Sequence, residues 1–388
     1  MPDPLFLHNR RAALICDLGL TARSFPRAPS SATLPCVRDI RFVEELEQRC
    51  NADWPAIRAA RRQTEELVGR VGAALAPLHT AETSIIATGS VGRAEVTQGS
   101  DFDWYLLIDG PSDPDHFRLA QRIEEELVNL GIKKPAAAGP FGAMVISHDL
   151  VHYIAGSRDT NENLTRRILL LLESRAISNP LLRERVIRNV LARYVISDPP
   201  VPSRSGRRTK VPHFLLNDVV RYWRTIASDF ASKMWERQLK GWGIRNVKLR
   251  FSRKLLFIGG LLGCFAADLS PSDEINEAPT EQEYLMLLAD LIFQQTRLSP
   301  LDQLARVLCR HEPELGSRML GAYDAFLAAL DDPSRRSALE KVDFEDANQS
   351  AEFERLRKAS QIFRKAVNEL FFDRDETLKR LVRDFGFF

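Results

Sequence analysis

The chain has 388 residues, of which 44% are hydrophobic and 27% are charged, as is ordinary for a globular protein. Its 54 basic and 52 acidic residues give a net charge of +2, which excludes a global basic field for nucleic acid. The length exceeds what one hydrophobic core usually needs, so two domains are expected.

The cysteines and the apolar runs indicate the compartment. The cysteines are odd in number and widely spaced, and no Cys-x-x-Cys pair occurs, so neither a zinc site nor a disulfide framework is predicted. A reducing cytoplasm is therefore the expected location. The apolar runs are too short for a membrane span. The five cysteines are Cys16, Cys36, Cys50, Cys264 and Cys309.

The first half of the chain mixes predicted helices with short strands. Residues 1–45 are expected to form an irregular segment because prolines and serines are frequent there. Beyond it we predict a helix over 54–78, strands over 83–88 and 101–109, a helix from about 115 to 130, one or two strands within 143–154, and a helix over 163–177.

The second half carries helical patterns and no convincing strand. The best linker candidate is 198–212, which is rich in proline and arginine. The fold class is therefore α+β, with a small mixed-sheet domain over 46–200 and an all-helical domain over 211–388. The helices are predicted near 180–197, 212–240, 246–268, 280–296, 300–311, 316–331 and 350–384.

The stretch that carries chemistry runs from 89 to 104. Asp101 and Asp103 begin a predicted strand, where side chains two residues apart point the same way, while Phe102 points to the opposite face. Two like charges on one face favour a bound cation, and Mg²⁺ prefers such oxygen ligands. Two metal ions could then serve the attacking and leaving oxygens of a phosphoryl displacement. An Asp-x-Asp pair alone more often marks a solvated loop, so the interpretation depends on its context.

That context is a strand ending in Gly-Ser. Gly89 lets the backbone approach a triphosphate, and Ser90 offers a hydroxyl and an N–H. Gly92 and Arg93 follow at a predicted helix start, where N–H groups favour phosphate. Arg93 is expected either to offset phosphate charge or to brace Glu95.

This stretch resembles the signature of the DNA polymerase β-like nucleotidyltransferase superfamily, a Gly-Ser followed after about ten residues by Asp-x-Asp. The variant here is most similar to the uridylyltransferase domain that modifies the signalling protein PII. The resemblance covers roughly 80–180 and includes the predicted helix from Asn163 to Arg175. The matching residues are Thr88, Gly89, Ser90, Gly92, Arg93, Glu95, Ser100, Asp101 and Asp103.

The resemblance implies transfer of a nucleoside monophosphate from a nucleoside triphosphate, with release of pyrophosphate. Asp101 and Asp103 would be catalytic metal ligands for Mg²⁺ (or Mn²⁺), and Gly89, Ser90, Arg93 and Ser100 would contact the nucleotide. The acceptor stays open between a protein side chain, a nucleic-acid end and a second nucleotide. The chain lacks the HD metal motif of the PII-modifying enzymes, which favours a stand-alone signal or oligonucleotide synthase.

Two other classes of function remain. The first is a non-catalytic homologue that binds a nucleotide or a partner, against which the intact Asp-x-Asp argues. The second is a pure nucleic-acid binder, which the near-neutral net charge disfavours.

Members of the superfamily usually carry a third carboxylate on a later strand. Asp149 is our candidate as catalytic residue and metal ligand, because its surroundings look strand-like; a turn aspartate is the equally plausible alternative. Asp159 is a weaker candidate because it follows a loop-like stretch. His148 and His152 flank this region, and we assign them no catalytic role.

One basic region stands out in the second half. Five cations fall between 245 and 254, and Lys248 and Arg250 are expected to contact the nucleotide from the second wall of the cleft. Arg221 and Arg224 lie three residues apart on one helical face and are expected to contribute to the same wall. For any single residue, a solvated helix face is the simpler interpretation. The five cations are Arg245, Lys248, Arg250, Arg253 and Lys254.

Overall fold

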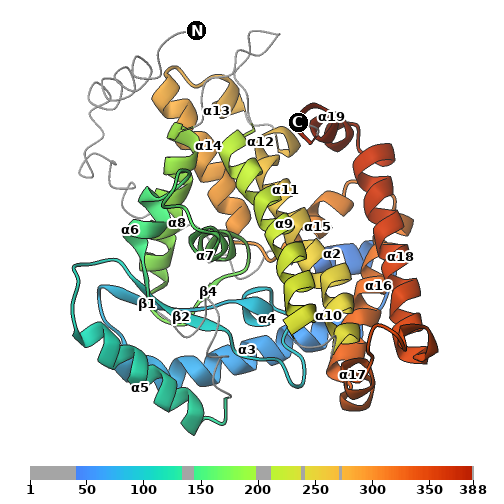
Figure 1. Cartoon of the computed structure of the whole chain (residues 1–388). Coiled ribbons are helices and arrows are strands. Elements are labelled where there is room, and N and C mark those ends of the chain that lie inside the picture. The colour runs from blue at the N-terminus through green and yellow to red at the C-terminus, as the bar shows by residue number, and fades with distance from the viewer. Residues whose placement is uncertain (1–40, 133–143, 198–210, 237–240, 271–272, 387–388) are drawn as a thin grey trace. The chain divides into compact units, whose positions relative to one another are not determined.

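The computed structural model describes residues 41–132, 144–197, 211–236, 241–270 and 273–386 (Figure 1). Arg41–Phe388 make up one compact unit. Of the irregular segment expected over 1–45, residues 1–40 lie outside the described residues, and the prediction is wrong from Phe42 on, where α2 begins. Most of the expected linker also lies outside the described residues, so the boundary between the two domains stays a prediction.

Seven helices and four strands make up the first half of the described chain. The helices are α2 (Phe42–Arg49), α3 (Pro55–Leu75), α4 (Gly89–Gly92), α5 (Asp115–Asn129), α6 (Ser147–His152), α7 (Asn161–Leu172) and α8 (Pro180–Ser197), with a 3₁₀ turn η2 (Ala76–Leu78) after α3. The strands are β1 (Thr83–Ala87), β2 (Trp104–Ile108), β3 (Met144–Ile146) and β4 (Arg175–Ala176).

The four strands form one mixed sheet in the order β3-β2-β1-β4. Strand β1 pairs antiparallel with β2 and β4, and β2 pairs parallel with β3. In the register of the central pair, Thr83 lies opposite Ile108 and Ala87 opposite Trp104. The end of β1 and the start of β2 are therefore neighbours at one edge of the sheet, and the residues that follow β1 meet those that precede β2.

The two central strands are buried on both faces. Ile85 and Leu106 pack with α3 and α5, whereas Ile86 and Leu107 join the larger core that includes α7 and α8 (Figure 1). Burial of both faces explains why β2 reads as a continuous apolar run rather than as an alternating pattern.

The expected elements of this half are confirmed with three differences in extent. The second strand begins at Trp104 rather than Asp101. The predicted strands within 143–154 are wrong beyond Ile146, because helix α6 begins at Ser147. The hydroxyl of Ser147 donates a hydrogen bond to Asp109 Oδ1 (2.6 Å). The helix expected to reach 177 ends at Leu172 and leads into β4.

The rest of the described chain is helical, as expected, and holds no strand after β4 in the residues that the structure covers. None of the helices described there or earlier is both long and apolar enough to cross a membrane. The elements are α9 (His213–Glu236), α10 (Trp242–Lys248), the π-helical turn η3 (Leu249–Arg253), α11 (Lys254–Cys264), α12 (Ala266–Leu269), α13 (Asp273–Asn276), α14 (Glu281–Thr296), α15 (Pro300–Leu308), α16 (Pro313–Asp331), α17 (Pro333–Glu340), the 3₁₀ turn η4 (Ala347–Gln349), α18 (Ala351–Glu369), the π-helical turn η5 (Leu370–Arg374) and α19 (Glu376–Phe385).

Helix α17 is absent from the sequence-based prediction, although its start carries a clear signal. Asp332 caps it by accepting hydrogen bonds from the N–H groups of Ser334 and Arg335, and Pro333 occupies the first helical position. An Asp-Pro-Ser sequence is a typical helix start, because the carboxylate satisfies free N–H groups and proline needs no partner there.

Aromatic rings hold the helix that runs through α10, η3 and α11 in place. Phe251, at the centre of η3, stacks on Phe326 of α16 with ring centroids 4.7 Å apart and contacts Phe363 of α18 at 5.5 Å. All three rings are buried. Their burial fixes the direction in which the neighbouring cations of this helix point.

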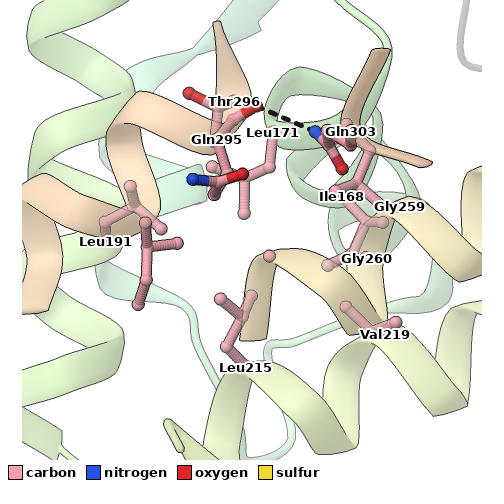
Figure 2. Close-up of a pocket in the computed structure, with 13 residues that line it drawn as sticks. Ile168, Leu171, Leu191, Leu215, Val219, Gly259, Gly260, Gln295, Thr296 and Gln303 are labelled. Atoms are coloured by element: carbon pink, nitrogen blue, oxygen red, sulfur yellow. Dashed lines mark hydrogen bonds between the residues drawn. The ribbon is translucent and has the colours of Figure 1, made fainter. Parts of the chain in front are cut away.

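Glycines let α11 approach the sheet-bearing half closely. A Cβ added at Gly260 would lie 2.7 Å from Val219 Cγ1 of α9 and 3.1 Å from Leu172 Cδ1 of α7. Figure 2 shows this region, where Gly259 and Gly260 line a cavity of about 10 Å³ together with apolar side chains. A cavity of that volume has room for about one water molecule. The close packing of α11 therefore depends on glycine at position 260, which has no side chain.

The glycines of α11 give a matched pair of substitutions. Gly260→Ala is expected to lower the free energy of unfolding by about 1–3 kcal/mol, because the new methyl group overlaps a stiff valine. Gly263→Ala, where an added Cβ meets nothing within 4 Å, is expected to raise it by about 0.5–1 kcal/mol through helix propensity. Chemical denaturation of both variants measures the difference; equal effects would contradict the close approach at Gly260.

Candidate active site

The two aspartates of the motif lie directly before β2. The backbone N–H of Thr88, which follows β1, donates to the carbonyl of Asp103 (2.8 Å), so the end of one strand is tied to the start of the other. Gly89 has a φ of +64°, and a Cβ there would lie 2.8 Å from Asp103 Oδ2. Only glycine suits this position, because its backbone conformation and the nearby carboxylate both disfavour a side chain.

Helix α4 begins at Gly89 and ends at Gly92, a full turn earlier than expected. Ser90 is half-buried in it, and its carbonyl accepts a hydrogen bond from the N–H of Glu95 (2.8 Å). Gly92 lies so close to the backbone of Glu173 that an added Cβ would be 1.9 Å from its carbonyl oxygen. The motif therefore packs directly against the segment that joins α7 to β4.

The turn before Asp101 is held from two sides. Ser100 Oγ accepts a hydrogen bond from the N–H of Thr97 (3.0 Å) and so closes the turn. Arg336 of α17 donates to the carbonyls of Gly99 (2.7 Å) and Gln98 (3.2 Å). The contacts of Ser100 therefore shape the backbone that carries Asp101, and its expected nucleotide contact stays a prediction.

A buried ion network lies behind the motif. Arg93 Nε donates to Glu95 Oε2 (2.8 Å), and its guanidinium also forms an ion pair with Glu173. The hydroxyl of Tyr323, on α16, donates to the other oxygen of Glu95 (2.6 Å). All four side chains are buried. The network thus joins the motif, the end of α7 and the helical half.

The partners of Arg93 decide between its two expected roles. Burial alone would lower the pKa of Arg93, but the charges of Glu173 and Glu95 raise it above its usual value. The guanidinium is committed to two carboxylates in the interior, so it braces Glu95 and does not face a phosphate site. Its expected nucleotide contact is not what the structure shows.

Asp103 lies at the edge of the same network. Burial raises the pKa of Asp103, the charge of Arg253 opposes this rise, and Glu173 and Asp101 add to it. Arg253 Nη1 lies 3.4 Å from Glu173 Oε1. Arg253 is therefore the cation that offsets the crowded carboxylates at the start of β2.

A cleft opens beside Asp101, with a volume of about 770 Å³. Pockets of this size suit small organic ligands. Most of its charged lining comes from α10 and α17. The lining residues are Asp101, Gly241, Ile244, Arg245, Lys248, Arg336 and Glu340.

The structure brings Lys248 to this cleft, as expected for a nucleotide contact. Burial and the nearby charges of Arg336 and Arg253 lower the pKa of Lys248 to about 8, and Asp101 partly opposes that shift. An anion in the cleft would favour the charged lysine, because it supplies the counter-charge that the site lacks.

Arg250 does not line the cleft. It donates to Asn246 Oδ1, and burial together with Arg357 and Arg364 of α18 lowers its pKa. Two positions after Lys248 on the same helix, Arg250 points toward a different neighbour. Its expected contact with the nucleotide is therefore wrong for the structure described.

Asp149 does not meet Asp101 and Asp103. Strand β3 runs parallel to β2 with Ile146 opposite Ile108, so the residues after β3 lie beyond the far end of β2. Five residues of strand separate that end from Asp103, which is ~16 Å at the usual rise per residue. Asp149 is also helical, in α6, rather than on a strand.

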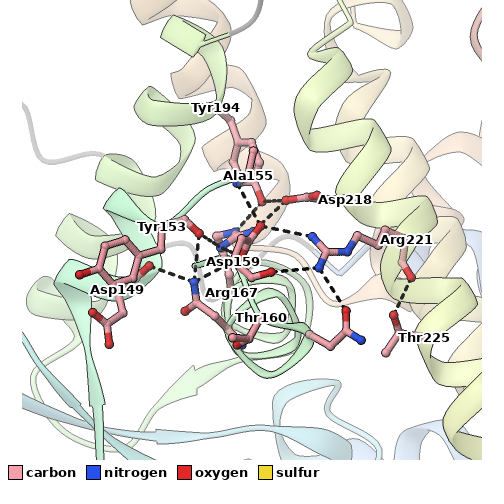
Figure 3. Close-up of polar contacts among 12 residues, drawn as sticks. Asp149, Tyr153, Ala155, Asp159, Thr160, Arg167, Tyr194, Asp218, Arg221 and Thr225 are labelled. Carbon is pink, nitrogen blue, oxygen red and sulfur yellow. Dashed lines mark hydrogen bonds and ion pairs between the residues drawn. The ribbon is translucent and has the colours of Figure 1, made fainter. Parts of the chain in front are cut away.

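The weaker candidate, Asp159, belongs to a second buried network (Figure 3). Its carboxylate pairs with Arg167 (3.0 Å) and with Arg221 (3.3 Å). Arg167 also contacts Asp218 of α9 (2.8 Å) and the hydroxyl of Tyr194 (2.6 Å). Arg221, expected in the wall of the cleft, instead ties α9 to the start of α7, and Asp159 serves the same connection.

Asp101 and Asp103 fit a magnesium site in the chemistry of their donors. Among the described residues, no group of three histidine, cysteine or acidic side chains is arranged to hold a metal ion. Mg²⁺ bound together with a nucleotide usually takes only one or two carboxylates, and phosphate oxygens and water complete its shell. Two carboxylates beside a cation-lined cleft match that pattern.

Sequence reasoning missed two contributors and left the roles of two others unassigned. Tyr323 and Arg336 carry no recognisable motif, and they act from more than 200 positions away. Glu173 belongs to the matched helix and Arg253 to the basic region, but neither pattern pairs the two. The available signal in the sequence was a glutamate directly after an apolar helix, because a charge that such a position buries needs a partner.

Removal of the buried arginine tests the network. Arg93→Met is expected to lower the free energy of unfolding by about 3–5 kcal/mol, because two buried carboxylates lose their shared cation. Arg118→Met breaks a pair whose side chains are 78% and 70% exposed, and should cost less than about 1 kcal/mol. Denaturant titration compares the two variants, and similar losses would refute the role given to Arg93.

Comparison with known proteins adds an independent finding. Residues 51–139 match the family model described as "Putative nucleotidyltransferase DUF294". No curated protein matches the sequence. The matched residues include Gly89, Ser90 and both aspartates of the motif. The match to the segment that carries Asp101 and Asp103 is consistent with the DNA polymerase β-like nucleotidyltransferase superfamily.

Proposed function

We propose that the protein transfers a nucleoside monophosphate from a nucleoside triphosphate to an acceptor hydroxyl, with Mg²⁺ or Mn²⁺ held by Asp101 and Asp103. The observation that carries the proposal is the position of Asp101 on the wall of a cleft that also contains Lys248, Arg245 and Arg336. Carboxylates for metal on one side and cations for phosphate on the other suit a metal–triphosphate complex.

Each residue has a defined task in this proposal. Gly89 leaves room beside Asp103, so that the α-phosphate can approach the carboxylate. Lys248 gains a counter-charge when the triphosphate enters, and Arg253 keeps Asp103 from repelling Glu173 and Asp101. A bound divalent ion would neutralise phosphate charge and activate the attacking oxygen.

The proposed step balances as a simple displacement. The acceptor oxygen forms a bond to the α-phosphorus, and the bond between that phosphorus and the β-bridging oxygen breaks. Pyrophosphate leaves with the electron pair, and the acceptor's proton passes to water. A non-catalytic nucleotide binder is the alternative, and the intact pair of carboxylates argues against it because a metal-assisted displacement depends on both of them.

Substitution of the two aspartates tests the proposal. Asp101→Asn and Asp103→Asn are each expected to reduce nucleotide transfer by about 10²–10³-fold, the loss typical of a strong transition-state contact. Asp149→Asn should retain activity, since Asp149 lies beyond the far end of β2. Labelled ribo- and deoxyribonucleoside triphosphates with Mg²⁺ or Mn²⁺, followed by pyrophosphate release and product size, provide the measurement.

Three outcomes are distinguishable in that assay. A labelled protein, an extended oligonucleotide or a small nucleotide product would identify the acceptor class. Wild-type protein that binds metal and triphosphate with no turnover, when supplied with all three acceptor classes, would favour the non-catalytic alternative. Loss of metal-dependent binding as well would refute the proposal.

The lowered pKa of Lys248 gives a pH dependence. Lys248 faces Arg336, Arg253, Arg93 and Asp101, is charged below about pH 8, and loses its proton above that value. Binding of tripolyphosphate without metal is therefore expected to weaken by up to about tenfold between about pH 7 and pH 9, as the charged fraction falls. Lys248→Arg should flatten this profile because arginine stays charged. A profile unchanged by the substitution would exclude Lys248 as the titrating group.

A further inference from the structure

The helix through α10, η3 and α11 presents cations in two directions. Arg245 and Lys248 line the cleft beside Asp101. Arg250 and Lys254 lie one turn apart on the same helix and interact instead with arginines of α18. The π-helical turn η3, which contains Arg250, follows Lys248 and changes the direction in which successive side chains point.

Helix α18 supplies the other half of this second group. Arg357 and Arg364 are seven positions apart, which places them on one face of the helix. Phe363 of α18 contacts Phe251 of η3, so the two helices lie side by side at this point. We call Arg250, Lys254, Arg357 and Arg364 the second cation patch.

The charges in the second cation patch are poorly compensated. Burial, then Arg357 and Arg364, lower the pKa of Arg250; burial, then Arg364 and Arg250, lower the pKa of Lys254. In the described part of the chain, Arg357 is the one member of the patch with a carboxylate ion pair, to Glu354 (2.8 Å). The mutual repulsion of these cations would be relieved by a bound anion.

We infer that the second cation patch binds the phosphate backbone of a single-stranded nucleic acid whose end enters the cleft at Asp101. Positions 245 and 254 are nine residues apart, or ~13 Å along a helix. That length is enough for more than one phosphate of a strand. A nucleoside triphosphate held at Asp101 would use only the cations of the cleft, so the patch has no role in binding that substrate.

The inference makes a nucleic-acid end the favoured acceptor, and in that role it rests on the proposed nucleotide transfer. Binding of the strand itself does not depend on transfer. The near-neutral net charge is compatible with this, because binding then depends on a local row of cations. A strand bound this way should be recognised through its phosphates and therefore with little base preference.

The test measures binding of a fluorescent oligouridylate of about 12 nucleotides, a length within the range of single-strand sites. Fluorescence anisotropy is recorded with EDTA and without nucleoside triphosphate, between about 50 and 200 mM KCl. Lys254→Gln with Arg364→Gln is compared with Arg355→Gln with Arg383→Gln, which removes two cations whose side chains are 65% and 73% exposed.

The patch variant is expected to bind the oligouridylate about tenfold or more weakly than wild type. The slope of log affinity against log salt should fall by about 1.4, or 0.7 for each cation removed. The control variant should change neither quantity. Equal behaviour of the two variants would overturn the inference. Arg364→Gln alone, at an exposed position, repeats the test if the double variant fails to fold.

Tripolyphosphate, as a second ligand, shows whether the patch binds a strand or a small anion. Tripolyphosphate binding should be unchanged in the patch variant; if only that binding weakens and oligouridylate binding does not, the patch serves a small anion and the inference is wrong. Transfer onto the oligouridylate is measured separately with Mg²⁺. Absence of transfer with patch-dependent binding intact would exclude the strand end as the acceptor, while leaving both the strand site and the other acceptor classes of the proposed function standing.

Discussion

The shared burial of Arg93 with Glu95 and Glu173 is the constraint on which the site depends. A guanidinium enclosed by two carboxylates is stable only if all three groups stay in place, because loss of any one leaves an uncompensated charge in the interior. Glu173 ends α7, and Tyr323 adds the hydroxyl of a distant helix to Glu95. The backbone between Gly89 and Glu95 is thereby held against both halves of the chain, and the aspartates at the start of β2 take their positions from it.

The electrostatics of the site are unbalanced on both sides of the cleft. Burial and neighbouring acids disfavour the charged form of Asp103, and burial and neighbouring arginines disfavour the charged form of Lys248. Each group therefore lacks the kind of ligand that a metal–triphosphate complex supplies in one molecule. The cations of the second cation patch, farther along the helix than Lys248, also lack compensating negative charge. Perturbed groups of this kind are concentrated at functional sites more often than elsewhere.

The sequence was informative where the contacts are local. Gly89 and Asp103 are fourteen positions apart and meet through neighbouring strands, so the motif already indicates their approach. The partners of Arg93 and Glu95 come from 80 and 228 positions away, and no periodic pattern encodes such pairs. Asp149 was misplaced because Val145 and Ile146 favour a strand, whereas tertiary packing ends that strand after three residues. The longer helices of the second half were predictable from apolar spacing, but α13, α17 and the directions of individual cations were not.

The hydrogen bond from Tyr323 to Glu95 affects how the segment that carries the motif can be inherited. The residues that match the nucleotidyltransferase family end at 139, yet the groups that neutralise its interior charges come from α7, η3 and α16. A gene fragment encoding the matched residues alone would yield a chain in which Arg93 lacks Glu173, Glu95 lacks Tyr323 and Asp103 lacks Arg253. Recombination could transfer this segment only together with the helices that supply those partners. The two halves of the chain are therefore expected to be inherited together as one unit, whichever acceptor the protein uses.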